Sequence, residues 1–593
     1  MVGKKVVHVV GSFLGALVVL GLLLLLLTTP VTNLAASEAS IMVDTLDDEL
    51  NNDGDCSLRE AIQAANDDAP VDACPAGSAI TDTITFSSDG TILLGSPLLI
   101  PTGSSLVIDA GGTITISGGS QVRIFVVYIG AELTLRNLTL VDGFGATSGG
   151  AIYNDGSAWI ENSALSENAV SESGGAVYNS GTMDIDNSTL YSNSVSLHYG
   201  SGGAIYNSGT LNINGSIITD NRTPLEAGRG GGIYNSLGAV LSVSSTQFLR
   251  NTGSLGGGIN NDGQVNIYGS SFEGNIACSG GGFLSDRYTD TVNIIMDSTI
   301  YDNHAISYPG VDWPGQGGGI LVRNLLVISN TTISANSALY SGGGIYGRGV
   351  LTLTHSTVVD NHVVEGTGHN ILLRGDITFR NSIITGATDG QNCDLGLDQP
   401  IDDGYNIEDG FTCGLSPASG SMPGTDPMLD TLQDNGGSTL THALLPGSPA
   451  LDGAKPDYCP PADQRGIARP VDGDGNGEAI CDIGSFESRR PTMTMITSDQ
   501  PDPSQVGAPF TTTFSVTTTF GIPTGVVIVA GGKGTCSGEL LDGNGSCQMT
   551  LTGSGTYTLT ATYNGDGVYE ISHGTEIHVV LPGKVYLPLI NKP

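Results

Sequence analysis

A short acidic stretch has the residue types and spacing with which proteins bind calcium. Residues 472–478 are Asp-Gly-Asp-Gly-Asn-Gly-Glu, so Asp472, Asp474 and Asn476 place side-chain oxygens at positions 1, 3 and 5 of an EF-hand-type loop, with glycine at position 6. Position 12 is Ile483, so the bidentate carboxylate that completes such a loop is missing. We predict either a weak calcium site or an acidic turn bounded by a disulfide, and no other cofactor.

The nine cysteines fall into four pairs that are close in the sequence, with one left over. Scattered histidines and the lack of a Cys-x-x-Cys unit disfavour a zinc site. We expect the remaining cysteine, Cys278, to be a buried small hydrophobic residue. The disulfide candidates are Cys56 with Cys74, Cys393 with Cys413, Cys459 with Cys481, and Cys536 with Cys547.

The chain offers few residues that could cleave a polysaccharide. Hydrolysis needs paired carboxylates, and elimination needs a basic residue to abstract a proton. His369, Asn370 and Arg374 are weakly similar to one strand of the pectin hydrolases, but the Asp-Asp pair on the preceding turns and the Arg-Ile-Lys motif are missing. We expect no enzyme activity; the alternative is a polysaccharide lyase or glycoside hydrolase acting on an acidic polysaccharide. Three further histidines are expected at exposed turns: His304, His355 and His362.

A repeat of about 25 residues organises most of the chain. Its clearest copy, residues 202–221, is Gly-Gly-Ala-Ile-Tyr-Asn-Ser-Gly-Thr-Leu-Asn-Ile-Asn-Gly-Ser-Ile-Ile-Thr-Asp-Asn. Such a period predicts a solenoid, in which each repeat contacts only its neighbours. The first glycines of the copies are Gly149, Gly174, Gly202, Gly230, Gly256, Gly280, Gly317 and Gly342, with a degenerate copy at Gly366.

Three apolar positions recur in each copy and predict three short strands. In the copy at 202–221 they are Ile205, the pair Leu211 and Ile213, and Ile218. Strands of this length, ended by Gly, Asn or Asp, predict an all-β chain that forms a right-handed parallel β-helix over residues 82–425. The copy near Asn293 breaks the second apolar pair.

An asparagine follows the third strand of each copy. We predict that it adopts left-handed backbone angles and bonds to the equivalent turn of the neighbouring copy. The members of this stack are Asn168, Asn193, Asn221, Asn251, Asn275, Asn303, Asn336 and Asn361.

Residues 1–36 are predicted to be a signal peptide or a membrane anchor. Lys4 and Lys5 precede an apolar run of 22 residues, and small residues suited to cleavage follow at 34–36. In either case the rest of the chain is expected to be extracellular or on the cell surface, where disulfides persist. If the segment is not cleaved, it is the one expected contact with a membrane.

Residues 41–81 are predicted to cap the N-terminal end of the solenoid with a short helix. Leu58, Ile62 and Ala65 lie on one face among strong helix formers. An open solenoid end exposes strand edges that need a cover. Residues 56–62 are Cys-Ser-Leu-Arg-Glu-Ala-Ile, so the stretch resembles the CSLREA domain at the start of secreted bacterial β-helix proteins.

The repeats resemble the polymorphic outer-membrane protein repeat, which pairs Gly-Gly-Ala-Ile with a later Phe-x-x-Asn. Residues 202–205 give the first half, and residues 248–251 and 272–275 give the second. That family consists of surface-exposed proteins with adhesive roles, so the resemblance implies an adhesin-like function.

Residues 426–488 resemble the choice-of-anchor Q domain, which implies an association with surface attachment. We expect this region to cover the last turn of the solenoid. The matching motifs are Asp426-Pro427-Met428-Leu429, Asp434-Asn435-Gly436-Gly437, Thr441-His442-Ala443-Leu444, Pro446-Gly447-Ser448-Pro449-Ala450, Asp463-Gln464-Arg465-Gly466 and Cys481-Asp482-Ile483-Gly484-Ser485-Phe486-Glu487.

Residues 492–580 are rich in threonine, with turns at intervals of roughly ten residues, and predict a β-sandwich. Pro523-Thr524-Gly525 and Tyr563-Asn564-Gly565-Asp566 resemble a bacterial Ig-like repeat. Residues 581–593 form a tail that is too short to span a membrane.

The composition restricts the partners. A formal charge of −38 repels phosphates and excludes nucleic acid as an expected partner. We expect a monomeric, non-catalytic protein of the cell surface that acts in adhesion, surface structure or glycan binding, with a cell-surface glycan or protein as its partner.

Overall fold

The computed structural model describes residues 39–78, 80–286, 291–309, 315–387, 391–396, 399–519 and 521–583. The predicted signal peptide or anchor (1–36) and the tail beyond residue 583 lie outside the described residues. Among the helices that are described, none combines the length and the apolar character needed to cross a membrane.

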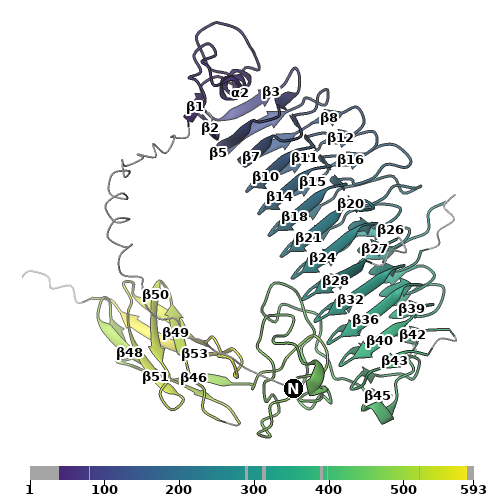
Figure 1. Cartoon of the computed structure of the whole chain (residues 1–593). Helices are drawn as coiled ribbons and strands as arrows, with labels where there is room; N and C mark the ends of the chain where they lie inside the picture. Colours follow the sequence, from purple (N-terminus) through teal and green to yellow (C-terminus); the bar gives the residue numbers. More distant parts are fainter. Residues whose placement is uncertain are drawn as a thin grey trace, which may run out of the picture.

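The described chain is almost entirely β, with a parallel β-solenoid followed by a separate β-sandwich (Figure 1). One face of the solenoid is a 12-stranded parallel sheet with one strand for each turn, or rung. After the first turns, its strands are β9 (Ile152–Asn154), β13 (Val177–Asn179), β17 (Ile205–Asn207), β20 (Ile233–Asn235), β23 (Ile259–Asn261), β27 (Phe283–Ser285), β31 (Ile320–Val322), β35 (Ile345–Gly347), β39 (Ile371–Leu373) and β42 (Cys393–Asp394).

The other two strands of each rung belong to one large parallel sheet that bends around a corner. The longer strands are β10 (Ser157–Glu161), β14 (Thr182–Asp186), β18 (Thr210–Asn214), β21 (Val240–Ser244), β24 (Gln264–Tyr268), β28 (Val292–Met296), β32 (Leu325–Ser329), β36 (Val350–Thr354) and β40 (Ile377–Arg380). The shorter strands are β11 (Ala164–Ser166), β15 (Thr189–Tyr191), β19 (Ile217–Thr219), β22 (Gln247–Leu249), β25 (Ser271–Glu273), β29 (Thr299–Tyr301), β33 (Thr332–Ser334), β37 (Thr357–Val359) and β41 (Ile383–Thr385).

Two-residue strands, which the repeat pattern did not reveal, follow the third strand on many rungs. They form separate parallel sheets of three and four strands. These strands are β8 (Phe144–Gly145), β12 (Ala169–Val170), β16 (Ser194–Val195), β26 (Ile276–Ala277), β30 (His304–Ala305), β34 (Ser337–Ala338) and β38 (His362–Val363).

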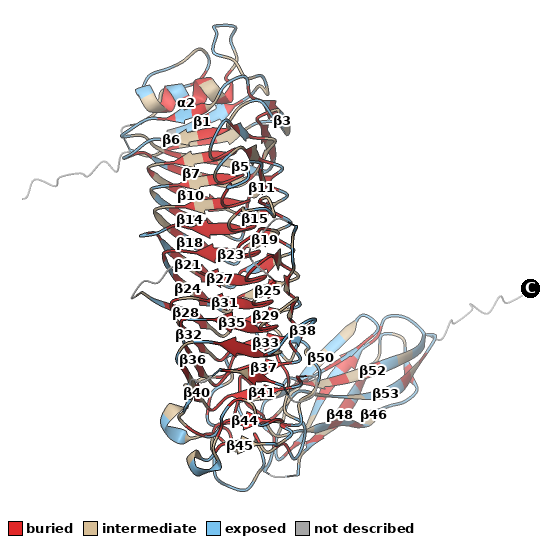
Figure 2. Cartoon of the chain, turned by 90° about the vertical axis from the view of Figure 1, so that its right-hand side faces the viewer, coloured by how far each residue is buried: buried red, intermediate tan, exposed pale blue. Residues whose placement is uncertain are grey.

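The apolar ladders predicted from the repeat fill the interior of the solenoid. Ile205, Leu211 and Ile218 have no solvent-exposed area, and the same positions on other rungs stack on them in register. Figure 2 shows the resulting buried column along the whole rod. The three-sided β-helix predicted from the sequence is therefore confirmed.

The first glycines of the repeats have positive φ, as a tight corner requires. Gly202 has φ +68°, and its neighbouring rungs have Gly174 at +66° and Gly230 at +62°. In the degenerate copy the equivalent residue is Gly368, with φ +68°, so the assignment of that corner to Gly366 was wrong by two residues.

The asparagine stack after the third strand is confirmed, but its predicted backbone geometry is wrong. The side-chain amide of Asn193 donates to Oδ1 of Asn221 at 2.9 Å, and the backbone N–H of Asn193 reaches the same oxygen. The left-handed residue is the one before the asparagine, such as Asp220 with φ +56°. The turn is therefore made one residue earlier, which leaves the asparagine side chain pointing into the core.

A second asparagine ladder runs along the end of the first strand. Asn179 donates to Oδ1 of Asn207 at 2.8 Å, and Asn207 donates to Asn235 at 2.8 Å. On the rung where Ser285 replaces the ladder asparagine, Asn293 accepts from Asn261 at 3.2 Å. The apparent defect at Asn293 in the apolar pattern therefore continues this ladder.

The N-terminal end carries the predicted helix, α2 (Leu58–Asp67). Ser57 caps it, because its hydroxyl accepts from the N–H of Glu60 while the Glu60 carboxylate accepts from the N–H of Ser57. The helix packs on β1 (Ala39–Val43), β2 (Asp82–Phe86) and β4 (Leu98–Ile100) (Figure 2). The other strands of the first turns are β3 (Gly90–Leu93), β5 (Ser105–Ser117), β6 (Phe125–Val127) and β7 (Glu132–Val141).

Residues 426–488, named here the side segment, lie along the side of the solenoid rather than over its last turn. Asn330 donates to the carbonyl of Ala462 at 2.8 Å, and the hydroxyl of Ser334 lies 3.0 Å from Nε2 of His442. The last turn is instead extended by short strands that pair onward from the solenoid: β43 (Ile401–Asp402), β44 (Ile407–Glu408) and β45 (Met422–Pro423).

The C-terminal domain is the predicted β-sandwich. Its two sheets contain three and five strands. The Cys536–Cys547 disulfide joins β50 to β51, which belong to different sheets, rather than closing one hairpin. The strands are β46 (Met493–Gln500), β47 (Ser504–Gln505), β48 (Pro509–Thr517), β49 (Val526–Gly531), β50 (Gly534–Glu539), β51 (Asn544–Thr550), β52 (Gly555–Tyr563) and β53 (Ser572–Leu581).

We predict that the asparagine stack after the third strand carries much of the stability of the rod. Asn221→Ala leaves two buried N–H donors of Asn193 without an acceptor, so the free energy of unfolding should fall by at least about 2 kcal/mol. Asn212→Ala, which removes an exposed asparagine of the same rung, is the control and should change it by about 0.5 kcal/mol or less. Equal effects in urea unfolding would contradict the prediction.

Candidate functional site

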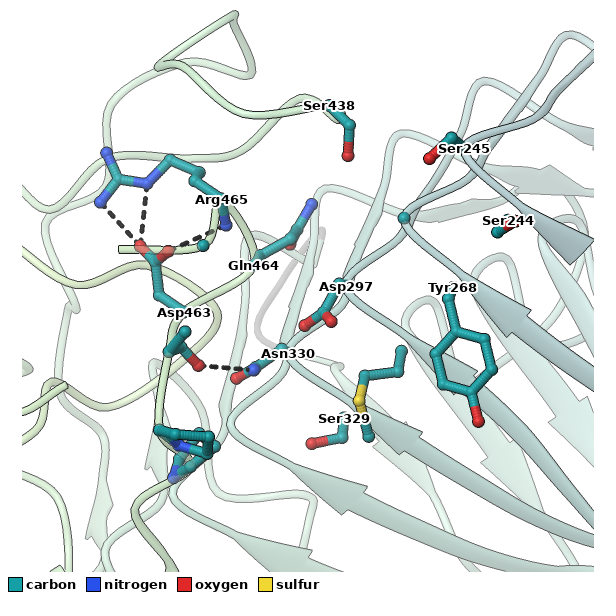
Figure 3. Close-up of a pocket in the computed structure, with 16 residues that line it drawn as sticks. Ser244, Ser245, Tyr268, Asp297, Ser329, Asn330, Ser438, Asp463, Gln464 and Arg465 are labelled. Atoms are coloured by element: carbon teal, nitrogen blue, oxygen red, sulfur yellow. Dashed lines mark hydrogen bonds and ion pairs between the residues drawn. The ribbon is translucent and has the colours of Figure 1, made fainter. Parts of the chain in front are cut away.

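A cleft of about 450 Å³ lies between the corners of four successive rungs and the side segment. On the solenoid side the strand ends Ser244, Tyr268, Met296 and Ser329 lie next to one another in register. We call it the rung–segment cleft (Figure 3). Its lining residues are Ser244, Ser245, Tyr268, Gly269, Met296, Asp297, Ser329, Asn330, Ser438, Pro460, Pro461, Ala462, Asp463, Gln464, Arg465 and Gly466.

The side segment contributes an ion pair that is already saturated. A guanidinium nitrogen of Arg465 lies 2.7 Å from Oδ2 of Asp463, and both side chains are buried. The Asp463 carboxylate also accepts from the backbone N–H groups of Arg465, Ile467 and Glu487. The guanidinium of Arg465 lies over the ring of Phe486, 3.5 Å from its centroid. This pair holds the shape of the segment and offers no spare charge to a ligand.

The floor of the rung–segment cleft holds two oxygen atoms without donors. In the described part of the chain, no hydrogen-bond donor reaches Oδ1 of Asp297 or Oδ1 of Asn330. Asn330 is only 4% exposed, and its amide nitrogen is fixed by Ala462. Burial raises the pKa of Asp297, an effect that the Asn330 side chain partly opposes. Figure 3 shows both side chains beside Gln464.

The side segment is fixed to the solenoid by a buried polar cluster. Arg469 forms an ion pair with Glu487 at 3.2 Å and also contacts Nδ1 of His355. Burial raises the pKa of Glu487 to about 7. His355 has no exposed area, so the prediction that it lies at an exposed turn was wrong. Burial, and next the Arg469 charge, lower the pKa of His355 well below its usual range.

The acidic loop brings Asp452 next to two of the predicted ligands, Asp472 and Asp474. One carboxylate oxygen of each of the three lies within 4.8 Å of the others. The side-chain amide of Asn476 donates to Oδ2 of Asp474 at 3.0 Å. Asp472 already forms an ion pair with Arg490. Asp452 accepts the backbone N–H of Asp474 at 2.9 Å. An arginine therefore lies at one carboxylate of this acidic turn, and calcium binding stays a prediction.

The residues that suggested a hydrolase have structural roles. Asn370 is buried and continues the asparagine stack from Asn361 to Asn392. Arg374 pairs with Asp394 at 2.9 Å. His369 accepts the backbone N–H of Val363 at 3.1 Å through Nδ1. His304 and His362 lie at the surface on other corners, outside the rung–segment cleft.

All four predicted disulfides are present, and Cys278 is a buried free thiol as expected. Cys393–Cys413 lies beside the last turn, and Cys459–Cys481 joins the middle of the side segment to the region near its C-terminal end. These two disulfides cross-link irregular parts of the chain, where few backbone hydrogen bonds connect neighbouring strands.

A Ser-His-Asp arrangement occurs inside the β-sandwich. Nε2 of His578 lies 2.9 Å from Oγ of Ser504, and Nδ1 lies 2.9 Å from Oδ2 of Asp499. His578 has no exposed area, Ser504 is 2% exposed, and the ring of Phe510 stacks on the imidazole. Because no substrate can reach the hydroxyl, the geometry serves to tie β46, β47 and β53 together.

Comparison with known proteins identifies the C-terminal domain. Residues 496–581 match the family described as "Bacterial Ig-like domain (group 3)". This confirms the Ig-like domain predicted from the sequence and assigns it to β46–β53. No curated protein and no solved structure matches the chain.

We predict that His355 makes the stability of the protein depend on pH. Its folded-state pKa is lowered, so the unfolded chain binds a proton near pH 6.5 that the folded chain does not. Stability from this group is therefore lost as the pH falls below about 6.5. The free energy of unfolding of the wild type minus that of His355→Gln should shrink between pH 7.5 and pH 5. A difference that is constant over this range would contradict the prediction.

We also predict that calcium adds little stability at the acidic turn. Arg490 pairs with Asp472, backbone N–H groups donate to the Asp452 carboxylate, and a bidentate ligand is missing. Millimolar calcium should leave the melting temperature of the full chain unchanged relative to the same ionic strength of sodium chloride. A calcium-dependent rise that Asp474→Asn abolishes would establish a calcium site.

Proposed function

We propose that this chain is a non-catalytic protein of the cell exterior or cell surface that acts in adhesion by binding a cell-surface glycan or protein. The observation that carries the proposal is the set of charged groups in the rung–segment cleft. Of its described lining residues, Asp297 is the only carboxyl outside an ion pair. The rest of the lining is mainly hydroxyl, amide, aromatic and aliphatic, which suits binding better than bond cleavage.

An extracellular location is supported by the cysteine chemistry and by the C-terminal domain. Four disulfides persist in an oxidising environment and are rare in the cytosol. The bacterial Ig-like domain at 496–581 is consistent with the same location. The predicted signal peptide or anchor at 1–36 would provide the export route.

The finer family resemblances support a surface role. Residues 56–62 carry the CSLREA motif, and the repeats resemble those of the polymorphic outer-membrane proteins. Residues 426–488 resemble the choice-of-anchor Q domain. Each of these families is associated with secreted or surface-exposed bacterial proteins, and their combination fits a rod that carries a binding surface away from the cell.

A polysaccharide-degrading enzyme is the second candidate, and Asp297 is the residue that favours it. Its raised pKa and its position in a cleft are features of a general acid. A glycoside hydrolase needs a second carboxylate on the other side of the bond. The nearest candidate, Asp463, is 1% exposed and held by Arg465, so it cannot serve.

The test is binding and turnover measured on the same preparation of the full chain. We expect saturable binding to an array of glycans and surface proteins, with no reducing ends and no unsaturated products released from neutral or uronate polysaccharides, with or without calcium. Release of product that Asp297→Asn abolishes would replace the proposal with the enzyme. Absence of binding to every glycan and protein would also contradict it.

A further inference from the structure

We infer that the rung–segment cleft binds a short neutral oligosaccharide. This inference rests on the proposed binding function and adds to it the site and the chemical class of the ligand.

The size of the cleft suits an extended chain of sugars. Its solenoid wall follows four rungs in register, and rungs about 4.8 Å apart give it a length of about 14 Å. Its volume, about 450 Å³, is within the range of small-ligand sites. Gly269 lets the side segment approach closely, because a Cβ there would lie 3.3 Å from Oγ of Ser438. The cleft is thus narrow and elongated.

The polar groups on the floor call for a ligand that donates hydrogen bonds. Asp297 lines the cleft as a half-buried carboxyl outside any ion pair of the described chain, and an ionised carboxylate only accepts hydrogen bonds. Oδ1 of Asp297 and Oδ1 of Asn330 are themselves buried, so the part of Asp297 that stays exposed is what faces a ligand. Sugar hydroxyls supply the matching donors.

The charges in the cleft exclude acidic sugars. Arg465 is the only basic residue among the described lining residues, and its side chain is 3% exposed. It is occupied by Asp463 and by the carbonyls of Asn435 and Glu487. A uronate would therefore meet the unpaired carboxylate of Asp297 with no cation to balance it. A neutral chain avoids this repulsion.

The apolar surface of the cleft fits the faces of sugar rings. Tyr268 is 38% exposed at the end of β24 and lies next to Met296 of the following rung. An aromatic ring with a polar tip presents an apolar face to the C–H groups of a pyranose while its hydroxyl stays in water. A carboxylate that accepts hydrogen bonds from sugar hydroxyls and an aromatic side chain at the rim together suit a carbohydrate.

The experiment compares cleft variants with matched controls by titration calorimetry on the full chain. The probes are neutral hexose oligomers of two to six units and uronate oligomers of the same lengths. The cleft variants are Tyr268→Ala and Asp297→Asn. The controls are Tyr191→Ala, at the end of β15, and Asp302→Asn, which has the same φ of +54° as Asp297 but is exposed and outside the cleft. Unchanged melting temperatures show that each variant is folded.

We expect the wild type to bind a neutral oligomer, with Kd raised about tenfold or more by each cleft variant and unchanged in the controls. Glycan binding that the cleft variants do not weaken would overturn this inference and leave the proposed function standing. Binding to proteins but to no glycan would likewise overturn this inference and leave the proposed function standing. Tighter binding of uronates, strengthened by Asp297→Asn, would overturn the ligand class. Failure to bind any glycan or protein would overturn both proposals.

Discussion

The structure depends on stacking of like residues in exact register from rung to rung. Asn193 gives both its side-chain amide and its backbone N–H to one oxygen of Asn221, and the pattern repeats along the rod. Because these groups are buried, each rung can satisfy its polar atoms only through the same position on the next rung. A slip by one residue would bury unpaired amides and expose the apolar ladders, so the register is fixed at every turn.

This register makes the corners of the rod regular enough to hold another part of the chain. The side segment bonds to corner residues on several rungs, among them Asn330, Ser334 and Asn381. A buried ion pair between Arg469 and Glu487 stabilises the packed segment. The rung–segment cleft is the space that remains between the side segment and the corners of four rungs. The cleft therefore follows from the packing of the side segment against corners that are held in register.

The periodic features could be predicted from the sequence because they depend on local spacing. The apolar ladders, the helix at Leu58–Asp67 and the four disulfides agree with the structure. Some positions differ from the prediction. The left-handed corner residue is Asp220 rather than Asn221, since a buried side chain and a tight turn compete for one position. His355 was expected at the surface because nothing near it in sequence reveals Arg469.

The sequence by itself determined the rod: repeat length, strand faces and the glycine corners all follow from neighbours along the chain and their equivalents one turn away. The candidate site was decided only in three dimensions. Asp297 and Asp463 are far apart in sequence, and no motif contains both. They line one cleft because residues 426–488 fold back along the side of the solenoid, a contact set by buried hydrogen bonds between distant residues. Such long-range contacts have no period, and so they leave no pattern in the sequence.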